Sequence, residues 1–96
     1  MKRFEDKVVI VTGASGGLGR AASIRLASEG AKLTLVGTNE EKLKETERLV
    51  KEENKDAETL IVTANVTKEE DVKKYVDETV KKWDRIDGLL NNSGVE

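Results

Sequence analysis

Four glycines within eight residues, in the stretch TGASGGLG from Thr12 to Gly19, restrict the fold of this chain more than any other feature. Glycine reaches positive φ without strain and lets other atoms approach the main chain closely. The residues before this stretch (KVVIV, 7–11) form an apolar, β-branched run typical of a strand buried on both faces. Residues 20–29 contain no helix breaker and precede Gly30, which suits a helix end. The glycines are therefore predicted to join a buried strand to a helix.

Such a junction is suited to binding an anion. The N-terminus of a helix carries unpaired N–H groups and the positive end of the helix dipole, so it stabilises a phosphate without a basic side chain. Gly13, Gly17 and Gly19 have the spacing G-x-x-x-G-x-G, which favours a phosphate-binding loop. No Gly-Lys-Ser/Thr follows, so the stretch is not a P-loop. The alternative is a tight strand-to-helix turn that binds no ligand.

Further apolar runs and helical patterns alternate along the rest of the chain. The apolar runs cover residues 32–36, 59–64 and 86–90, and the helical patterns cover residues 39–54 and 68–83. Two capping boxes are predicted at the helix starts, Thr38 with Glu41 and Thr67 with Glu70. The apolar faces of these two helices comprise Leu43, Thr46, Leu49 and Val50 in the first, and Val72, Tyr75, Val76, Val80 and Trp83 in the second.

The order βαβαβαβ predicts an α/β fold with a parallel sheet and right-handed crossovers. We expect residues 1–96 to form one three-layer half Rossmann domain, with four parallel strands in the order 3-2-1-4 and helices on both faces. The first two helices should cover one face and the third helix the other. Ligands bind beyond the carboxyl ends of such strands, where the winding reverses. That crevice lies between the first and fourth strands.

Composition excludes several functional classes. The chain contains no cysteine and no histidine, which excludes disulfides, zinc sites built on sulfur or imidazole, and histidine-based catalysis. Its net charge of -2 gives no electrostatic basis for binding nucleic acid or an anionic membrane. With no signal peptide or membrane span recognisable, we expect a cytoplasmic location. The absence of proline and the regular acid-to-base spacing over residues 69–82 suggest an engineered, consensus-like or thermophilic origin.

Two motifs together resemble the short-chain dehydrogenases/reductases, from about Phe4 to the last residue. The family's T-G-x-x-x-G-x-G appears at residues 12–19, and its N-N-A-G appears as Asn91-Asn92-Ser93-Gly94. Between them, Asn65-Val66 stands where the family usually has Asp-Val. The resemblance implies binding of NAD or NADP and, in the complete family, oxidation or reduction of a hydroxyl or carbonyl substrate.

The resemblance also assigns positions to the cofactor. Gly13, Gly17 and Gly19 would surround the diphosphate, with N–H groups near Ser15 and Leu18 directed at it. Asn65 and Val66 would flank the adenine, and the nicotinamide-side ribose would lie near Asn92, Ser93 and Gly94. Gly37 and Thr38 would lie beside the adenosine ribose. Thr12 and Asn91 are instead expected to tie the first strand to the fourth.

Three departures from the family pattern affect binding. Asn65 keeps an acceptor oxygen for the adenine amino group but lacks the charge of an aspartate. Ser93 adds a hydroxyl where the family has alanine. At the end of the second strand, Val36-Gly37-Thr38-Asn39 lacks the acidic residue that binds the ribose 2′-hydroxyl in NAD-preferring members, and no arginine replaces it. This favours NADP over NAD.

The family's catalytic Tyr-x-x-x-Lys pair, with its supporting Ser and Asn, follows the fourth strand. The one tyrosine here, Tyr75, has Thr79 four residues later and lies on the predicted apolar face, so no catalytic residue is assigned. We expect a segment that binds a dinucleotide without catalysis. The alternatives are a designed or excised structural fragment without a ligand, and one half of an enzyme completed by a second chain. The fourth strand would have an open edge, which predicts a homodimer through that strand.

Overall fold

A computed structural model describes residues 3–92 and contains the predicted elements. They are β1 (Val8–Thr12), α1 (Gly17–Ser28), β2 (Lys32–Gly37), α2 (Glu40–Glu53), β3 (Thr59–Thr63), α3 (Glu69–Trp83) and β4 (Gly88–Asn91). The largest difference from the predicted bounds is at α1, which begins at Gly17 rather than at residue 20. Its end is as predicted, because Gly30 follows the helix with φ +93°.

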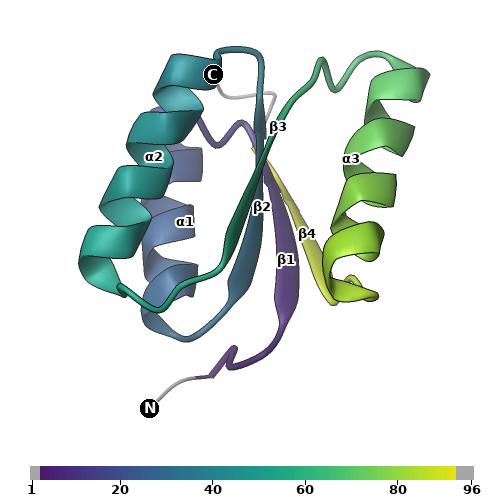
Figure 1. Ribbon diagram of the computed structural model, residues 1–96. Coiled ribbons are helices and arrows are strands. Elements are labelled where there is room, and N and C mark those ends of the chain that lie inside the picture. The colour runs from purple at the N-terminus through teal and green to yellow at the C-terminus, as the bar shows by residue number, and fades with distance from the viewer. Residues whose placement is uncertain (1–2, 93–96) are drawn as a thin grey trace.

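The strands form one parallel sheet in the order β3-β2-β1-β4, which confirms the predicted topology. In its register, Val9 of β1 lies between Leu33 of β2 and Gly88 of β4. Figure 1 shows α1 and α2 on one face and α3 on the other, so the predicted three layers are present. The carboxyl ends of all strands meet at the same edge of the sheet, which is where the glycine loop joins β1 to α1.

Alternation along the strands divides the core into two parts. Val9, Val11 and Leu35 pack with Leu43 and the other buried residues of α1 and α2. On the opposite face, the cluster under α3 comprises Ile10, Val36, Val62, Ala64 and Tyr75. None of the helices described over residues 3–92 is long and apolar enough to cross a bilayer.

Both predicted capping boxes are wrong. At α2 the capping residue is Asn39, whose Oδ1 accepts a hydrogen bond from the Lys42 N–H (3.1 Å), because it is the residue next to the first helical turn. Lys68 precedes α3, and no side chain caps this helix. The Thr67 hydroxyl donates instead to Asn65 Oδ1 (2.7 Å), which keeps it in the loop.

The predicted apolar face of α3 is wrong at Val80, whose side chain is 41% exposed. The buried residue is its neighbour Thr79, one position and therefore about 100° around the helix. Thr79 Oγ1 donates to the Tyr75 carbonyl and shares a hydrogen bond of 2.7 Å with Thr34 Oγ1 of β2. The regular acid-base pairs of α3 form no ion pair in the described part of the chain, and Lys74 donates to a β3 carbonyl instead.

Asp87 connects β4 to β1 through hydrogen bonds at the amino-terminal ends of these strands, opposite the glycine loop. Its Oδ2 accepts from the Val8 N–H (2.8 Å), and its own N–H donates to the Val8 carbonyl (2.8 Å). The hydrogen bond from Arg85 to Oδ1 is the main cause that lowers the pKa of Asp87, and the bond from Val8 adds to it. The charged carboxylate therefore stabilises the folded state.

We expect the Asp87→Asn variant to lose less stability than the wild type on acidification. A lowered pKa in the folded state contributes stability above the unfolded pKa of about 3.9, and this is lost as pH falls through the folded value. Urea denaturation from about pH 5 to about pH 2 measures the difference. The pKa of Glu45 is also lowered, but this residue is present in both proteins, so its effect on the pH dependence of stability cancels in the comparison. Identical pH dependence in the two proteins would refute this role of Asp87.

Candidate functional site

The glycine loop forms a tight connection from β1 to the first turn of α1. Gly13 has φ +65°, a conformation that favours glycine, and the Gly16 N–H donates to the Gly13 carbonyl (3.1 Å). The Ala14 N–H donates to the Val36 carbonyl (3.0 Å) at the end of β2. A Cβ atom on Gly19 would lie 2.0 Å from the Gly13 oxygen, so only glycine lets the helix contact the loop here.

The start of α1 is arranged to receive an anion. Gly16 precedes the helix without a side-chain cap, and the first turn contains no acidic residue. A Cβ atom on Gly17 would meet no atom within 4 Å, and Gly17 and Leu18 are exposed. The first N–H groups of a helix lack partners within the helix, and the dipole makes this end positive. The space in front of Gly17 therefore fits a phosphate group.

Gly37 and Thr38 lie beside this loop, at the end of β2. A Cβ atom on Gly37 would lie 3.0 Å from Ser15 Oγ and 3.2 Å from a Leu43 methyl carbon. Gly37 therefore gives Ser15 the room to lie against β2, while Thr38 is exposed at the same edge. Asn39 is engaged by its bond to the Lys42 N–H. Thr38 thus contributes the exposed side chain nearest the end of this strand.

Asn65 and Val66 follow β3 at the same edge of the sheet. Asn65 Oδ1 accepts from both the N–H (3.0 Å) and the hydroxyl (2.7 Å) of Thr67, and Asp71 accepts from the Asn65 N–H (2.7 Å). The two bonds from Thr67 use both lone pairs of Asn65 Oδ1, so an adenine amino group would have to displace one of them. Val66 is half-buried against the core under α3.

Thr12 ties β1 to β4, as predicted. Its hydroxyl lies 2.9 Å from Asn91 Oδ1 and accepts from the Asn92 N–H (3.2 Å). The side-chain nitrogen Nδ2 of Asn92 is buried and has no hydrogen-bond partner within residues 3–92. Asn92 therefore lies directly after β4, next to the carboxyl end of β1. Ser93 and Gly94, also predicted to contact the cofactor, lie outside the described residues.

The remaining features of the described residues do not indicate a second ligand site at the glycine loop. A shallow cavity of about 550 Å³ at the start of α3 is lined by Lys68, Glu69, Glu70 and Lys73, and none of these belongs to the glycine loop. Within residues 3–92, no group of acidic side chains could hold a metal ion. Tyr75 is 4% exposed in the core under α3, which confirms its predicted place on the apolar face of that helix.

Comparisons with known proteins agree with this geometry. The family model described as short chain dehydrogenase matches residues 7–96. Levodione reductase from Leifsonia aquatica is 48% identical over 94 residues, which are 98% of this chain and 35% of that protein. The crystal structure of levodione reductase superposes with a TM-score of 0.89 at 47% identity, covering 91% of this chain and 34% of that chain.

Two of the similar solved structures contain a nicotinamide cofactor. NAD⁺-bound xylitol dehydrogenase has a TM-score of 0.85 at 40% identity, covering 92% of this chain and 33% of that one. Carveol dehydrogenase from Mycobacterium avium, in complex with NAD, has a TM-score of 0.87 at 30% identity, covering 96% and 37%. The chain spans about a third of the length of the curated relatives it matches.

Proposed function

Because this chain belongs to the short-chain dehydrogenase family, we propose that it binds the adenosine diphosphate part of a nicotinamide dinucleotide at the glycine loop. The observation that carries the proposal is the open space at Gly17, directly in front of the uncapped start of α1. A loop needed only for a turn requires glycine at positions 13 and 19, but it does not require the absence of a side chain at position 17.

We further propose that the chain binds without catalysing hydride transfer by itself. It spans about a third of its relatives, and its single tyrosine is buried in the core under α3. Binding should be weak, because a half domain buries little of the ligand surface. Activity of the chain alone on a generic carbonyl substrate would contradict this proposal.

The end of β2 supports a preference for NADP over NAD. Neither of the two residues after Gly37, Thr38 and Asn39, is acidic, and the first acidic side chains are Glu40 and Glu41 in the first turn of α2. The exposed Thr38 hydroxyl can donate a hydrogen bond to a 2′-phosphate. Isothermal titration with ADP, NAD and NADP tests both the site and the preference. We expect all three to bind, with NADP the tightest. No heat and no chemical-shift change at millimolar ligand would refute the binding function, and tighter binding of NAD would refute the preference alone.

Within residues 3–92, β4 pairs with β1 on one side only, and this edge supports assembly with a second chain. Leu89 and Leu90 are 57% and 37% exposed, and they point to opposite faces because they pair with Ile10 and Val11. An uncovered apolar edge strand favours pairing with another strand. We propose that two copies associate through β4. The other candidate partner for β4 is a separate chain that supplies the catalytic half. Reductase activity that appears when this chain is mixed with that second chain would identify it.

We expect Leu89→Lys to shift the chain toward monomer in equilibrium sedimentation, because a charge on the paired edge must lose water on association. Leu18→Lys is the matched control, since Leu18 is also exposed (62%) but lies at the glycine loop. It should leave the association constant unchanged. A wild type that remains strictly monomeric at high concentration would remove the proposed dimer.

A further inference from the structure

Asn65, directly after β3, has three of its four hydrogen-bonding groups engaged by the protein itself. Its N–H donates to Asp71 Oδ2 (2.7 Å), and its carbonyl accepts from the Lys68 N–H (3.0 Å). Its side-chain oxygen Oδ1 accepts from both the N–H and the hydroxyl of Thr67. The fourth group, the side-chain amino group Nδ2, is accessible to solvent and has no hydrogen-bond partner within residues 3–92. Asn65 therefore offers a ligand a donor but no free acceptor.

The N–H group of Val66 is a second donor at the same edge of the sheet, without a partner in the described part of the chain. In a planar trans peptide, the carbonyl and the following N–H point in opposite directions, and no described peptide bond is cis. The Asn65 carbonyl faces the Lys68 N–H, so the Val66 N–H points away from the start of α3. By the same rule the Val66 carbonyl points away from Asn65 Oδ1, which the Thr67 N–H faces. The two groups left for a ligand are thus both donors.

The glycine loop lies two strands away from Asn65 along this edge. The Ala14 N–H donates to the Val36 carbonyl (3.0 Å), and the Ala64 N–H donates to the Gly37 carbonyl (2.9 Å). Because β1, β2 and β3 are consecutive neighbours, the ends of β1 and β3 are about 10 Å apart. Gly37, at the end of the strand between them, carries no side chain. A nucleoside diphosphate held at the start of α1 can therefore place its base beside Asn65.

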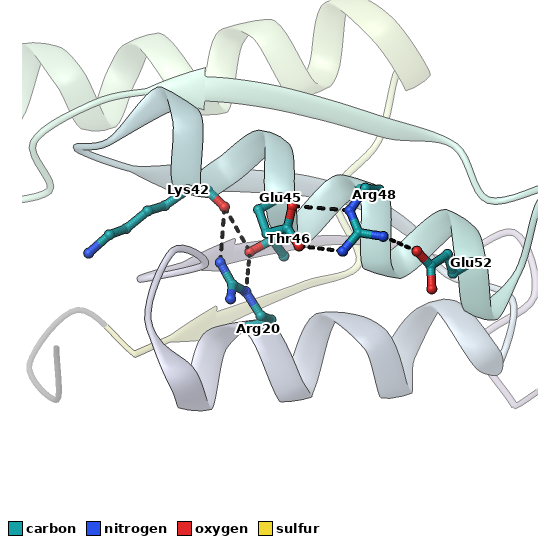
Figure 2. Close-up of polar contacts among 6 residues, drawn as sticks. All are labelled: Arg20, Lys42, Glu45, Thr46, Arg48 and Glu52. Atoms are coloured by element: carbon teal, nitrogen blue, oxygen red, sulfur yellow. Dashed lines mark hydrogen bonds and ion pairs between the residues drawn. The ribbon is translucent and has the colours of Figure 1, made fainter.

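The glycine loop is also anchored to α2, on the side away from β3. Thr46 is fully buried, and its Oγ1 lies 2.8 Å from the Ala14 carbonyl oxygen. Figure 2 shows that Arg20 Nε donates to the same Oγ1 (3.0 Å), while its Nη2 donates to the Lys42 carbonyl (3.3 Å). These groups pair with one another and are not free to contact a base. The loop thus has a fixed position from which the nucleoside extends toward Asn65.

Purine bases differ in the groups that they present at C6 and N7. Adenine presents a donor, its 6-amino group, beside the acceptor N7, whereas guanine and hypoxanthine present two acceptors, O6 and N7. Two donors match two acceptors, but the adenine amino group would face another donor or displace a bond from Thr67. We propose that Asn65 and Val66 select a 6-oxopurine, a base with oxygen at C6, over adenine. This inference rests on the proposed binding of a diphosphate at the glycine loop and names the nucleoside class of that ligand.

Titration with ADP, inosine diphosphate (IDP) and GDP tests the inference, because the three ligands share the ribose and the diphosphate and differ in the base. We expect IDP and GDP to bind about tenfold tighter than ADP, the equivalent of one hydrogen bond. Tighter binding of IDP alone would identify hypoxanthine as the preferred 6-oxopurine. If ADP binds as tightly as IDP or tighter, the inference is overturned and the proposed function stands. If none of the three binds, the proposed function itself fails.

Asn65→Asp is expected to reverse the preference. An ionised carboxylate only accepts hydrogen bonds, and its second oxygen would be free for the adenine amino group. ADP should then bind tighter than IDP. Because the measured quantity is a ratio of two affinities in one protein, a general weakening of the site cancels. An unchanged ratio would overturn the role of Asn65.

Thr67→Val and Thr63→Val separate competition by the Thr67 hydroxyl from other effects at this edge. Thr67→Val removes the hydroxyl but keeps the backbone bond, so one lone pair of Asn65 Oδ1 becomes free. We expect ADP affinity to rise severalfold while IDP affinity stays the same. Thr63 is also exposed, but it forms no hydrogen bond with Asn65 within residues 3–92, so Thr63→Val should keep the wild-type ratio. The same ratio in both variants would overturn the competition by Thr67.

The Val66 amide proton gives a direct test of the second donor. A hydrogen bond to the base should move its NMR signal downfield when IDP saturates the chain. A signal that does not move at saturation would overturn the role of Val66.

Discussion

Gly17→Val is expected to weaken ADP binding by at least about a hundredfold, as two hydrogen bonds to an anion are lost, while the chain stays folded. The reason is local. The Cβ position of Gly17 has no protein atom within 4 Å, so a valine fits the ligand-free structure and occupies the space proposed for the diphosphate. A glycine inside a helix is less favourable than most residues, so the free energy of unfolding should rise slightly.

Two measurements decide this prediction. Titration with ADP gives the affinity, and urea denaturation gives the free energy of unfolding. Gly88→Val is the matched control, because a Cβ atom there would lie at an ordinary contact distance from the Val9 methyl groups, 3.9 and 4.0 Å, on the edge strand β4. This control should bind ADP like the wild type. If Gly17→Val retains full affinity, the diphosphate does not approach the start of α1.

Gly19→Ala is expected to lose more stability than an added methyl group at Gly17, Gly30, Gly37 or Gly88. The added Cβ would lie 2.0 Å from the Gly13 oxygen, 2.6 Å from its carbonyl carbon and 2.9 Å from the Ala14 Cα. All three are backbone atoms, so the loop or the helix must move as a whole. We expect a destabilisation of at least about 3 kcal/mol, at the upper end of overpacking effects. The free energy of unfolding of a native protein is typically about 5–15 kcal/mol, so this loss would remove a large part of it.

Gly17→Ala provides the comparison, since it makes the same change two residues earlier on the same helix. Urea denaturation should show Gly17→Ala at or above wild-type stability and Gly19→Ala far below it or unfolded. Equal stability of the two variants would show that the helix does not contact the loop at Gly19. The pair distinguishes a glycine kept for packing from a glycine proposed to admit a ligand.

The strands, their order and the layers could be predicted because they depend on local patterns. The β-branched runs and helix formers define each element, and the alternation of strand and helix permits little besides a parallel sheet with right-handed crossovers. The tie between Thr12 and Asn91 followed from the family resemblance and is confirmed by the contact. The end of α1 at Gly30 was predictable because a positive φ favours glycine.

The errors arose where several local partners compete. Thr38 and Asn39 can both cap a helix, and the actual start of α2 selects Asn39. Thr67 lost its expected capping role to a bond with Asn65. On α3, hydropathy favoured Val80 for the buried face, but the hydroxyl of Thr79 finds a buried partner in Thr34. Sequence patterns do not contain the positions of such partners.

By itself, the sequence determined a glycine-rich connection between a buried strand and a helix in a four-stranded parallel sheet, because glycine content and hydropathy act through neighbouring residues. The tertiary structure alone decided what each glycine does. Gly19 is needed because the backbone of the loop lies against it, whereas Gly17 faces open space. The tertiary structure also brought Thr46 of α2 to the Ala14 carbonyl. This contact joins residues distant in the sequence and exists only once α1, α2 and the sheet have packed together.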